Sequence, residues 1–205
     1  VTPFTICPYA ISYLEFWLHF VSLIPNDRIH HHKELCCLYA NKIYHLLAKA
    51  RLQIQKAAKD GHERGMLFCE KKGEVLVQDL GKGGKRHLDV PKCPPKTTEI
   101  GTFHVHPSGD VRPSAADILV AINAKNTGEC IGGKVDGKDI VSCIEFNKDH
   151  RGWPETRRRL KEAAGRVVDE PKNKRAALLE RVVDLEIEAG IKKGTLKRST
   201  ESPWP

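Results

Sequence analysis

The chain has few of the features that mark small cross-linked or metal-clipped domains. Its 205 residues include seven cysteines, an odd number, and no two of them have the CxxC spacing of a zinc ribbon. Aromatic residues make up only 6% of the chain, and methionine occurs once. The sequence therefore predicts neither a disulfide framework nor a zinc ribbon. It favours a cytoplasmic protein with mostly buried thiols, and it leaves open a single bridge such as Cys130 to Cys143.

Long uninterrupted hydrophobic runs are also absent. The most apolar stretch, residues 9–24, contains Glu15 and His19, which a membrane-spanning helix would have to bury at a cost of several kcal/mol. Its polar residues recur at helical spacing, which predicts a mostly buried amphipathic helix rather than a signal peptide. We expect this helix to pack on the core of the protein, with a dimer contact or a membrane-surface anchor as alternatives.

Composition and charge describe a folded protein with a basic end. Hydrophobic residues make up 40% of the chain, which excludes wholesale disorder, and the formal net charge of +8 favours acidic partners. Residues 151–205 hold 14 basic and 9 acidic side chains, so they carry +5 of that charge. We divide the chain into an N-terminal extension (1–33), a central domain (34–150) and a basic helical segment (151–205) whose last residues, 192–205, are expected to be a loose end.

Hydrophobic periodicity predicts an α/β domain of the α+β type. A long helix is followed by a hairpin, a loop rich in glycine and proline, and then a strand, a helix and two more strands. Two further helices follow in the basic segment. The predicted ranges are helix 34–58, strands 66–69 and 75–77, loop 79–96, strand 99–106, helix 114–124, strands 130–135 and 140–146, and helices 155–168 and 174–189.

A candidate metal site lies between the predicted strand 99–106 and the helix that follows it. His104 and His106 are two residues apart, so on a strand they project from one face, about 7 Å apart along the backbone. Asp117 falls in the first turn of the helix, from which its carboxylate can reach back to the imidazoles. Three protein ligands leave one tetrahedral position for water, which is typical of catalytic zinc. Taken singly, an exposed HxH and a capping box from Ser114 to Asp117 are ordinary alternatives.

The combined pattern resembles the signature of the JAMM (MPN-plus) zinc metalloproteases, the Mov34/Pad1 family. In that signature H-x-H-P is followed after six residues by S-x-x-D. His104, His106, Pro107, Ser114 and Asp117 match it in identity and spacing. The predicted order of elements also resembles that family's domain, over residues 40–147.

The resemblance implies both a fold and an activity. The fold would be the MPN/JAMM, cytidine-deaminase-like one, with a central mixed sheet flanked by helices. The activity would be that of an isopeptidase or peptidase that removes ubiquitin or ubiquitin-like modifiers. Zn2+ would be held by His104, His106 and Asp117, and Ser114 would polarise the substrate or stabilise the oxyanion. Modifier conjugates are thus the expected partners, and residues 79–96 occupy the place of the family's first insertion, which is expected to contact the modifier.

The resemblance also implies an upstream glutamate that acts as general base. Glu63 stands in the expected place, before the first strand after the long helix. The family usually has a glycine three residues after this glutamate, whereas Gly65 follows Glu63 by two. Glu70 is the alternative base, but it sits seven residues further on, beside the predicted turn. We favour Glu63.

A nucleic-acid-associated, DNA-repair-like metal protein is the alternative function. It rests on the basic C-terminal segment, notably Arg157 to Arg159. These arginines are interleaved with Glu155 and Glu162, and no pattern of aromatic and basic residues suited to stacking on bases appears. We therefore expect no specific nucleic-acid partner and no membrane partner. The histidines at 30–32 point in different directions on any regular element, and we interpret them as a polar turn.

Overall fold

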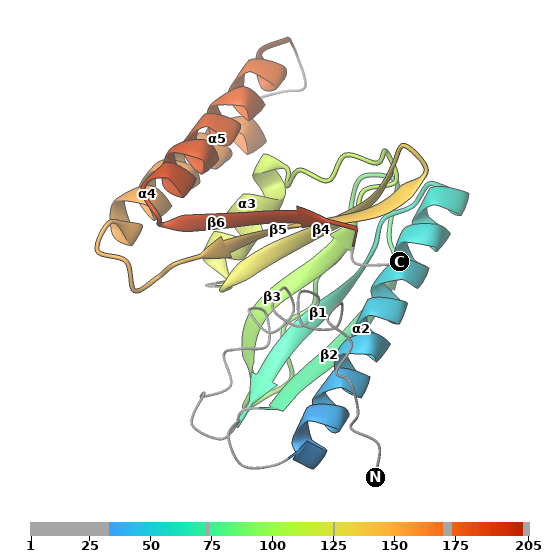
Figure 1. Cartoon of the computed structure of the whole chain (residues 1–205). Helices are drawn as coiled ribbons and strands as arrows, with labels where there is room; N and C mark the ends of the chain where they lie inside the picture. The colour runs from blue at the N-terminus through green and yellow to red at the C-terminus, as the bar shows by residue number, and fades with distance from the viewer. Residues whose placement is uncertain (1–32, 73, 125, 170–173, 203–205) are drawn as a thin grey trace.

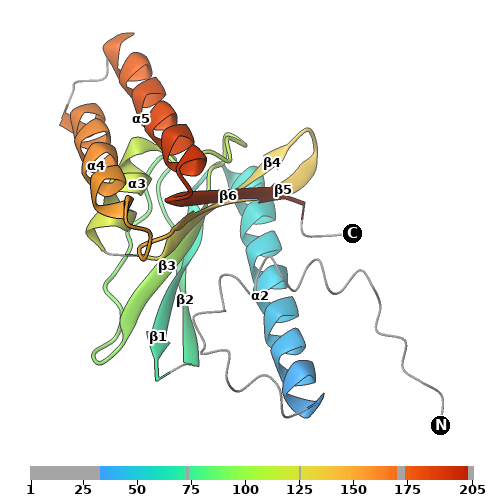
Figure 2. The same ribbon diagram turned by 60° about the vertical axis from the view of Figure 1, so that its left-hand side comes forward.

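The computed structural model describes residues 33–72, 74–124, 126–169 and 174–202. Their architecture is a mixed six-stranded sheet with one long helix on one face and three helices on the other (Figure 1, Figure 2). The predicted helix 9–24 and the turn at 30–32 lie outside the described residues. In chain order the elements are α2 (Lys33–Asp60), β1 (Arg64–Lys71), β2 (Glu74–Lys82), β3 (Thr98–Val105), α3 (Ala115–Asn123), β4 (Gly128–Val135), β5 (Lys138–Phe146), α4 (Trp153–Asp169), α5 (Lys174–Lys192) and β6 (Leu196–Glu201).

The strands lie in the order β2-β1-β3-β4-β5-β6. β3 and β4 run parallel, and every other neighbouring pair in this sheet is antiparallel. A parallel pair needs a crossover connection, and α3 provides it. The structure is thus a mixed α/β one, and its element order and mixed sheet are compatible with the expected α+β arrangement.

Two hydrophobic cores lie on opposite faces of the sheet, because side chains alternate along each strand. On β3, Phe103 and Val105 face α2 and belong to the core that α2 covers. The other core joins α3, α4 and α5 to residues of β5 and β6. The α2 core includes Leu47, Ile54, Met66, Phe68 and Val141, and the second core includes Ile118, Ile122, Ile144, Leu160, Val183, Ile187 and Leu196.

The end of the chain corrects one expectation from the sequence. Residues 192–205 were expected to be a loose end, but β6 pairs with β5 and extends the sheet by one strand. Leu196 anchors it, since its side chain is buried in the core that α3, α4 and α5 share, and the Ser142 and Thr200 hydroxyls lie 2.9 Å apart. The polar pattern of β6 suits an edge strand. A strand of polar residues has no alternation of hydrophobic side chains, so hydrophobic periodicity does not predict it.

Cysteine pairing corrects a second expectation, that the cysteines are mostly buried thiols with at most a single bridge among them. Two disulfides are present among the described residues. Cys130–Cys143 joins directly opposed residues of β4 and β5, and it is the single bridge that the sequence left open. Cys69–Cys93, which joins β1 to the loop between β2 and β3, was not anticipated. That loop begins after Lys82, because β2 pairs with β1 as far as Lys82 and so extends beyond the predicted strand 75–77.

No helix in the described part of the chain is both long and apolar enough to cross a membrane.

We expect the Cys130–Cys143 bridge to stabilise the fold mainly through the unfolded state. Its cysteines are 13 residues apart, a loop whose closure contributes on the order of 3 kcal/mol. The double variant Cys130→Ser/Cys143→Ser should therefore lose about that much free energy of unfolding, measured by urea denaturation. Peptide mapping of unreduced, alkylated protein is the direct control, and alkylated Cys130 and Cys143 in the folded parent would contradict the bridge.

Candidate metal centre

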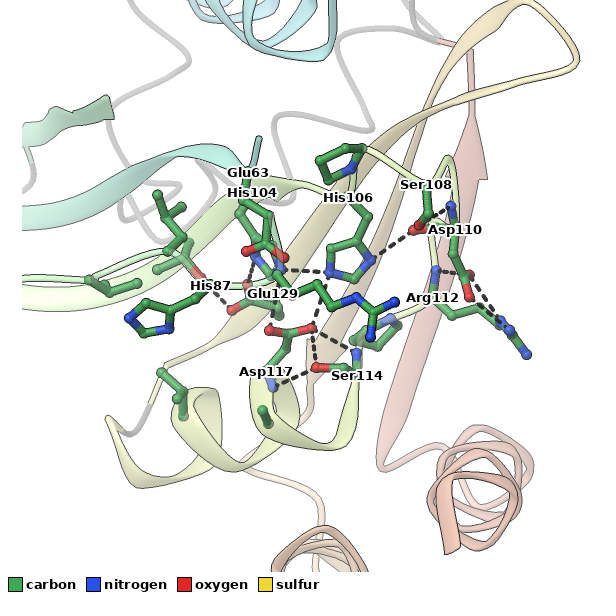
Figure 3. A pocket seen from close by; sticks show the side chains of 18 of the residues that line it. Glu63, His87, His104, His106, Ser108, Asp110, Arg112, Ser114, Asp117 and Glu129 are labelled. Atoms are coloured by element: carbon green, nitrogen blue, oxygen red, sulfur yellow. Dashed lines mark hydrogen bonds and ion pairs between the residues drawn. The ribbon is translucent and has the colours of Figure 1, made fainter. Parts of the chain in front are cut away.

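Three metal-binding side chains converge where β3 ends. His104 lies on β3 and His106 just beyond it, and their Nε2 atoms are 3.0 Å apart (Figure 3). Asp117, in the first turn of α3, places Oδ1 3.3 Å from Nε2 of His104 and Oδ2 3.4 Å from Nε2 of His106. One ligand atom from each residue lies within 4.8 Å of the others, so the group can hold a metal ion.

The other imidazole nitrogens are already occupied. Nδ1 of His104 lies 2.9 Å from a carboxylate oxygen of Glu129, and Nδ1 of His106 lies 2.8 Å from the backbone carbonyl oxygen of Asp110. Both partners accept hydrogen bonds, so both rings carry their proton on Nδ1 when neutral and leave Nε2 free to bind. The donor set is thus two imidazole nitrogens and one carboxylate, which fits a zinc ion.

Ser114 and Asp117 form the capping box that the sequence allowed. The Ser114 hydroxyl accepts a hydrogen bond from the backbone N–H of Asp117 at 3.3 Å, and the Ser114 backbone N–H donates to Oδ2 of Asp117 at 2.7 Å. The hydroxyl also donates to the same Oδ2, again at 2.7 Å. These contacts begin α3 and hold the carboxylate against the histidines, so Ser114 orients a metal ligand whatever else it does.

The electrostatics of the group favour a cation between its carboxylates. Burial opposes charging of His104, but hydrogen bonds to Asp117 and Glu129 outweigh it and raise the pKa of His104 to about 10. Burial likewise opposes ionisation of Asp117, yet hydrogen bonds from His104 and His106 hold its pKa well below the usual range. Without a metal, a proton on His104 supplies the positive charge that the carboxylates require.

Glu63, not Glu70, lies beside this group. Glu63 directly precedes β1 and lines the same cleft as the histidines (Figure 3). In the pairing of β1 with β3, Gly65 stands opposite His104, whereas Glu70 stands opposite Thr98 at the other end of both strands. Glu70 is therefore too far along β1 to act at the metal group. The role of Glu63 as general base stays a prediction.

The backbone around Glu63 is fixed by the loop that follows β2. Its N–H donates to the Gly84 carbonyl at 2.8 Å, and its carbonyl accepts from the N–H of Gly83 at 2.9 Å. Gly65 allows this approach, since a Cβ there would lie 2.5 Å from a backbone oxygen of β3 and 2.7 Å from Leu88. Burial raises the pKa of the Glu63 carboxyl above its ordinary range, and the nearby imidazoles oppose that shift.

A cleft of about 590 Å³ surrounds the metal group. Its walls carry opposite charges, with Lys85 and Arg86 on the β2–β3 loop and Glu180 and Asp184 on α5. Arg112 lines the cleft as well, and its guanidinium lies 3.6 Å from the carboxylate of Asp184. The sequence predicted α5 but gave no sign that it borders this cleft.

Two residues of the centre were missed in the sequence. Glu129 stands one position before the predicted strand 130–135, yet it lies within β4 among buried neighbours. The signal available in the sequence was a charged residue directly beside an apolar strand. Asp110 contributes a backbone carbonyl, and a contact made by the backbone cannot be predicted from the type of residue.

No protein-family model matches the chain, and the curated proteins contain no significant match to it.

We expect the protein to bind one zinc ion per chain at this group. His106→Ala removes one of the three ligands, so the variant should lose the zinc, as measured by elemental analysis of protein purified without added metal. His87→Ala is the matched control, because His87 lines the same cleft but lies outside the ligand set, and it should retain the metal. Full zinc occupancy in His106→Ala would refute the ligand assignment.

Zinc binding should also release a proton. Metal-free His104, with its pKa raised to about 10, is protonated at pH 7 to 9, and a metal ligand must be deprotonated. Apparent zinc affinity should therefore rise about tenfold per pH unit over that range for each proton displaced. Titration in weakly buffered indicator solution measures the release. An affinity that does not change between pH 7 and 9 would contradict this prediction.

Proposed function

We propose that the protein is a zinc-dependent isopeptidase or peptidase of the JAMM type that acts on conjugates of ubiquitin or a ubiquitin-like modifier. The observation that carries the proposal is the convergence of His104, His106 and Asp117 in one cleft with Glu63 beside them. The resemblance to the JAMM signature supplies the substrate class. Zinc is the proposed metal because two imidazoles and one carboxylate with an open position are the ligand set of catalytic zinc.

Zinc held at this site would supply Lewis-acid chemistry, polarising the substrate carbonyl and lowering the pKa of water to around 7. Glu63 would take the proton from the attacking water and return it to the leaving amine. Its raised pKa suits this exchange, because a more basic carboxylate accepts the proton more readily. The Ser114 hydroxyl would turn from Asp117 toward the developing oxyanion, while its backbone N–H keeps Asp117 in place.

The loop between β2 and β3 is the proposed contact surface for the modifier. It forms one wall of the cleft through residues 85–88 and 90, and the Cys69–Cys93 disulfide ties it to β1. An extended modifier tail would lie in the cleft as a strand added beside the sheet.

The cytoplasmic location stays a prediction of the sequence. The two disulfides weigh against it, since they are more typical of an oxidising compartment.

The nucleic-acid alternative finds less support in the basic segment. The Arg158 guanidinium lies 2.8 Å from Glu155 and 3.3 Å from Glu162, and Arg159 lies 2.7 Å from Glu186. These arginines already pair with carboxylates of α4 and α5. A phosphate backbone would have to displace those partners, so we do not favour nucleic acid as the substrate.

The proposal predicts that Glu63→Gln keeps its metal and its fold but loses most turnover. Removal of a general base costs on the order of a hundredfold or more. The assay is cleavage of a linear modifier fusion, with and without a chelator, and Glu70→Gln at the other end of β1 is the matched control. An active Glu63→Gln would reject Glu63 as the base, and parent protein that cleaves no fusion would contradict the proposed activity.

A further inference from the structure

Glu129 is a buried carboxylate that the proposed reaction does not use. It lies on β4 beside Cys130 and Ile131, and only 2% of it is exposed. Burying a carboxylate costs free energy unless hydrogen bonds satisfy it. The groups that satisfy it therefore indicate what it does.

Its two oxygens have different partners. One lies 2.9 Å from Nδ1 of His104, and the other accepts a hydrogen bond from the Thr102 hydroxyl. Thr102 stands directly opposite Glu129 in the parallel pairing of β3 and β4, and His104 lies two residues further along β3 on the same face. Glu129 thus reaches across from the neighbouring strand to the side of the ring away from the metal group (Figure 3).

This position excludes Glu129 as a metal ligand. Nε2 of His104 faces His106 and Asp117, whereas Nδ1 faces Glu129. Among the described residues, the set of converging ligand atoms contains His104, His106 and Asp117 but not Glu129. Glu129 can act on a metal only through the imidazole.

We propose that Glu129 is the positioning residue of the metal centre. By accepting the Nδ1–H of His104, it fixes the tautomer and the rotation of the ring that present Nε2 to the metal, and it makes that nitrogen a stronger donor. Thr102 fixes Glu129 in turn. A ligating histidine bonded to a carboxylate holds its metal more tightly than an unsupported one. The inference rests on the proposed zinc site and adds two residues to it.

Glu129→Gln tests this role, because it keeps the shape of the side chain and removes its charge. Zinc affinity is measured by competition with a chelating indicator, and the absorption spectrum of the cobalt-substituted protein reports the geometry of the site. We expect zinc to bind 10- to 100-fold more weakly, while circular dichroism and cooperative unfolding show an intact metal-free fold. Glu145→Gln, an exposed glutamate on β5, is the control and should bind zinc like the parent.

A folded Glu129→Gln with the parent's zinc affinity and cobalt spectrum would overturn the inference. If that variant does not fold, Thr102→Val decides. It leaves the carboxylate in place but removes its second hydrogen bond, so it should weaken zinc binding by a smaller factor, and unchanged affinity would overturn the proposal. Parent protein that binds no zinc would overturn the metal centre itself, and this inference with it. If the parent and both variants bind zinc equally tightly, the role of Glu129 is rejected while the proposed function is unaffected.

Discussion

β3 and β4 run parallel, and the centre depends on that pairing. Two parallel neighbours cannot be joined by a tight turn, so the chain must leave the end of β3, cross one face of the sheet as a helix and return to begin β4. α3 therefore begins beside the end of β3, where His104 and His106 lie. Asp117, in its first turn, meets the histidines because of this connection. The same pairing sets Glu129 of β4 opposite Thr102 of β3, on the face that carries His104.

Local patterns predicted much of the fold and the three converging ligands. Alternation and helical periods placed α2 through α5 and the strands β1, β3, β4 and β5 close to their observed bounds, whereas β2 runs to Lys82, well beyond the predicted strand 75–77. His104, His106 and Asp117 lie near one another in the sequence, and a strand followed by a helix brings them together. Glu63 was placed beside them only through the resemblance to a known family, and the antiparallel pairing of β1 with β3 accounts for its position at the cleft.

What escaped prediction depends on contacts between distant segments. β6 has no hydrophobic alternation, because an edge strand of polar residues takes its stability from pairing with β5 and from Leu196. Cys69 and Cys93 are 24 residues apart, and the path of the β2–β3 loop alone decides whether they meet. Glu129 is recognisable as a partner of His104 only when the parallel register is known. These features depend on the register of the sheet or on the path of a loop, and local sequence patterns specify neither.

The centre places ionisable side chains in the interior of the fold, where His104 and Glu129 are buried. Two hydrophobic cores hold the sheet from its two faces, and neither core contains His104, Asp117 or Glu129. Buried carboxylates are costly unless positive charge lies beside them, and a proton on His104, whose pKa is raised to about 10, supplies such a charge within this group. A divalent cation would replace that proton, neutralise Asp117 and Glu129 together, and link the end of β3 to the first turn of α3. Metal binding would therefore be linked to the stability of this junction, because an ion that binds only the folded arrangement of the three ligands stabilises that arrangement.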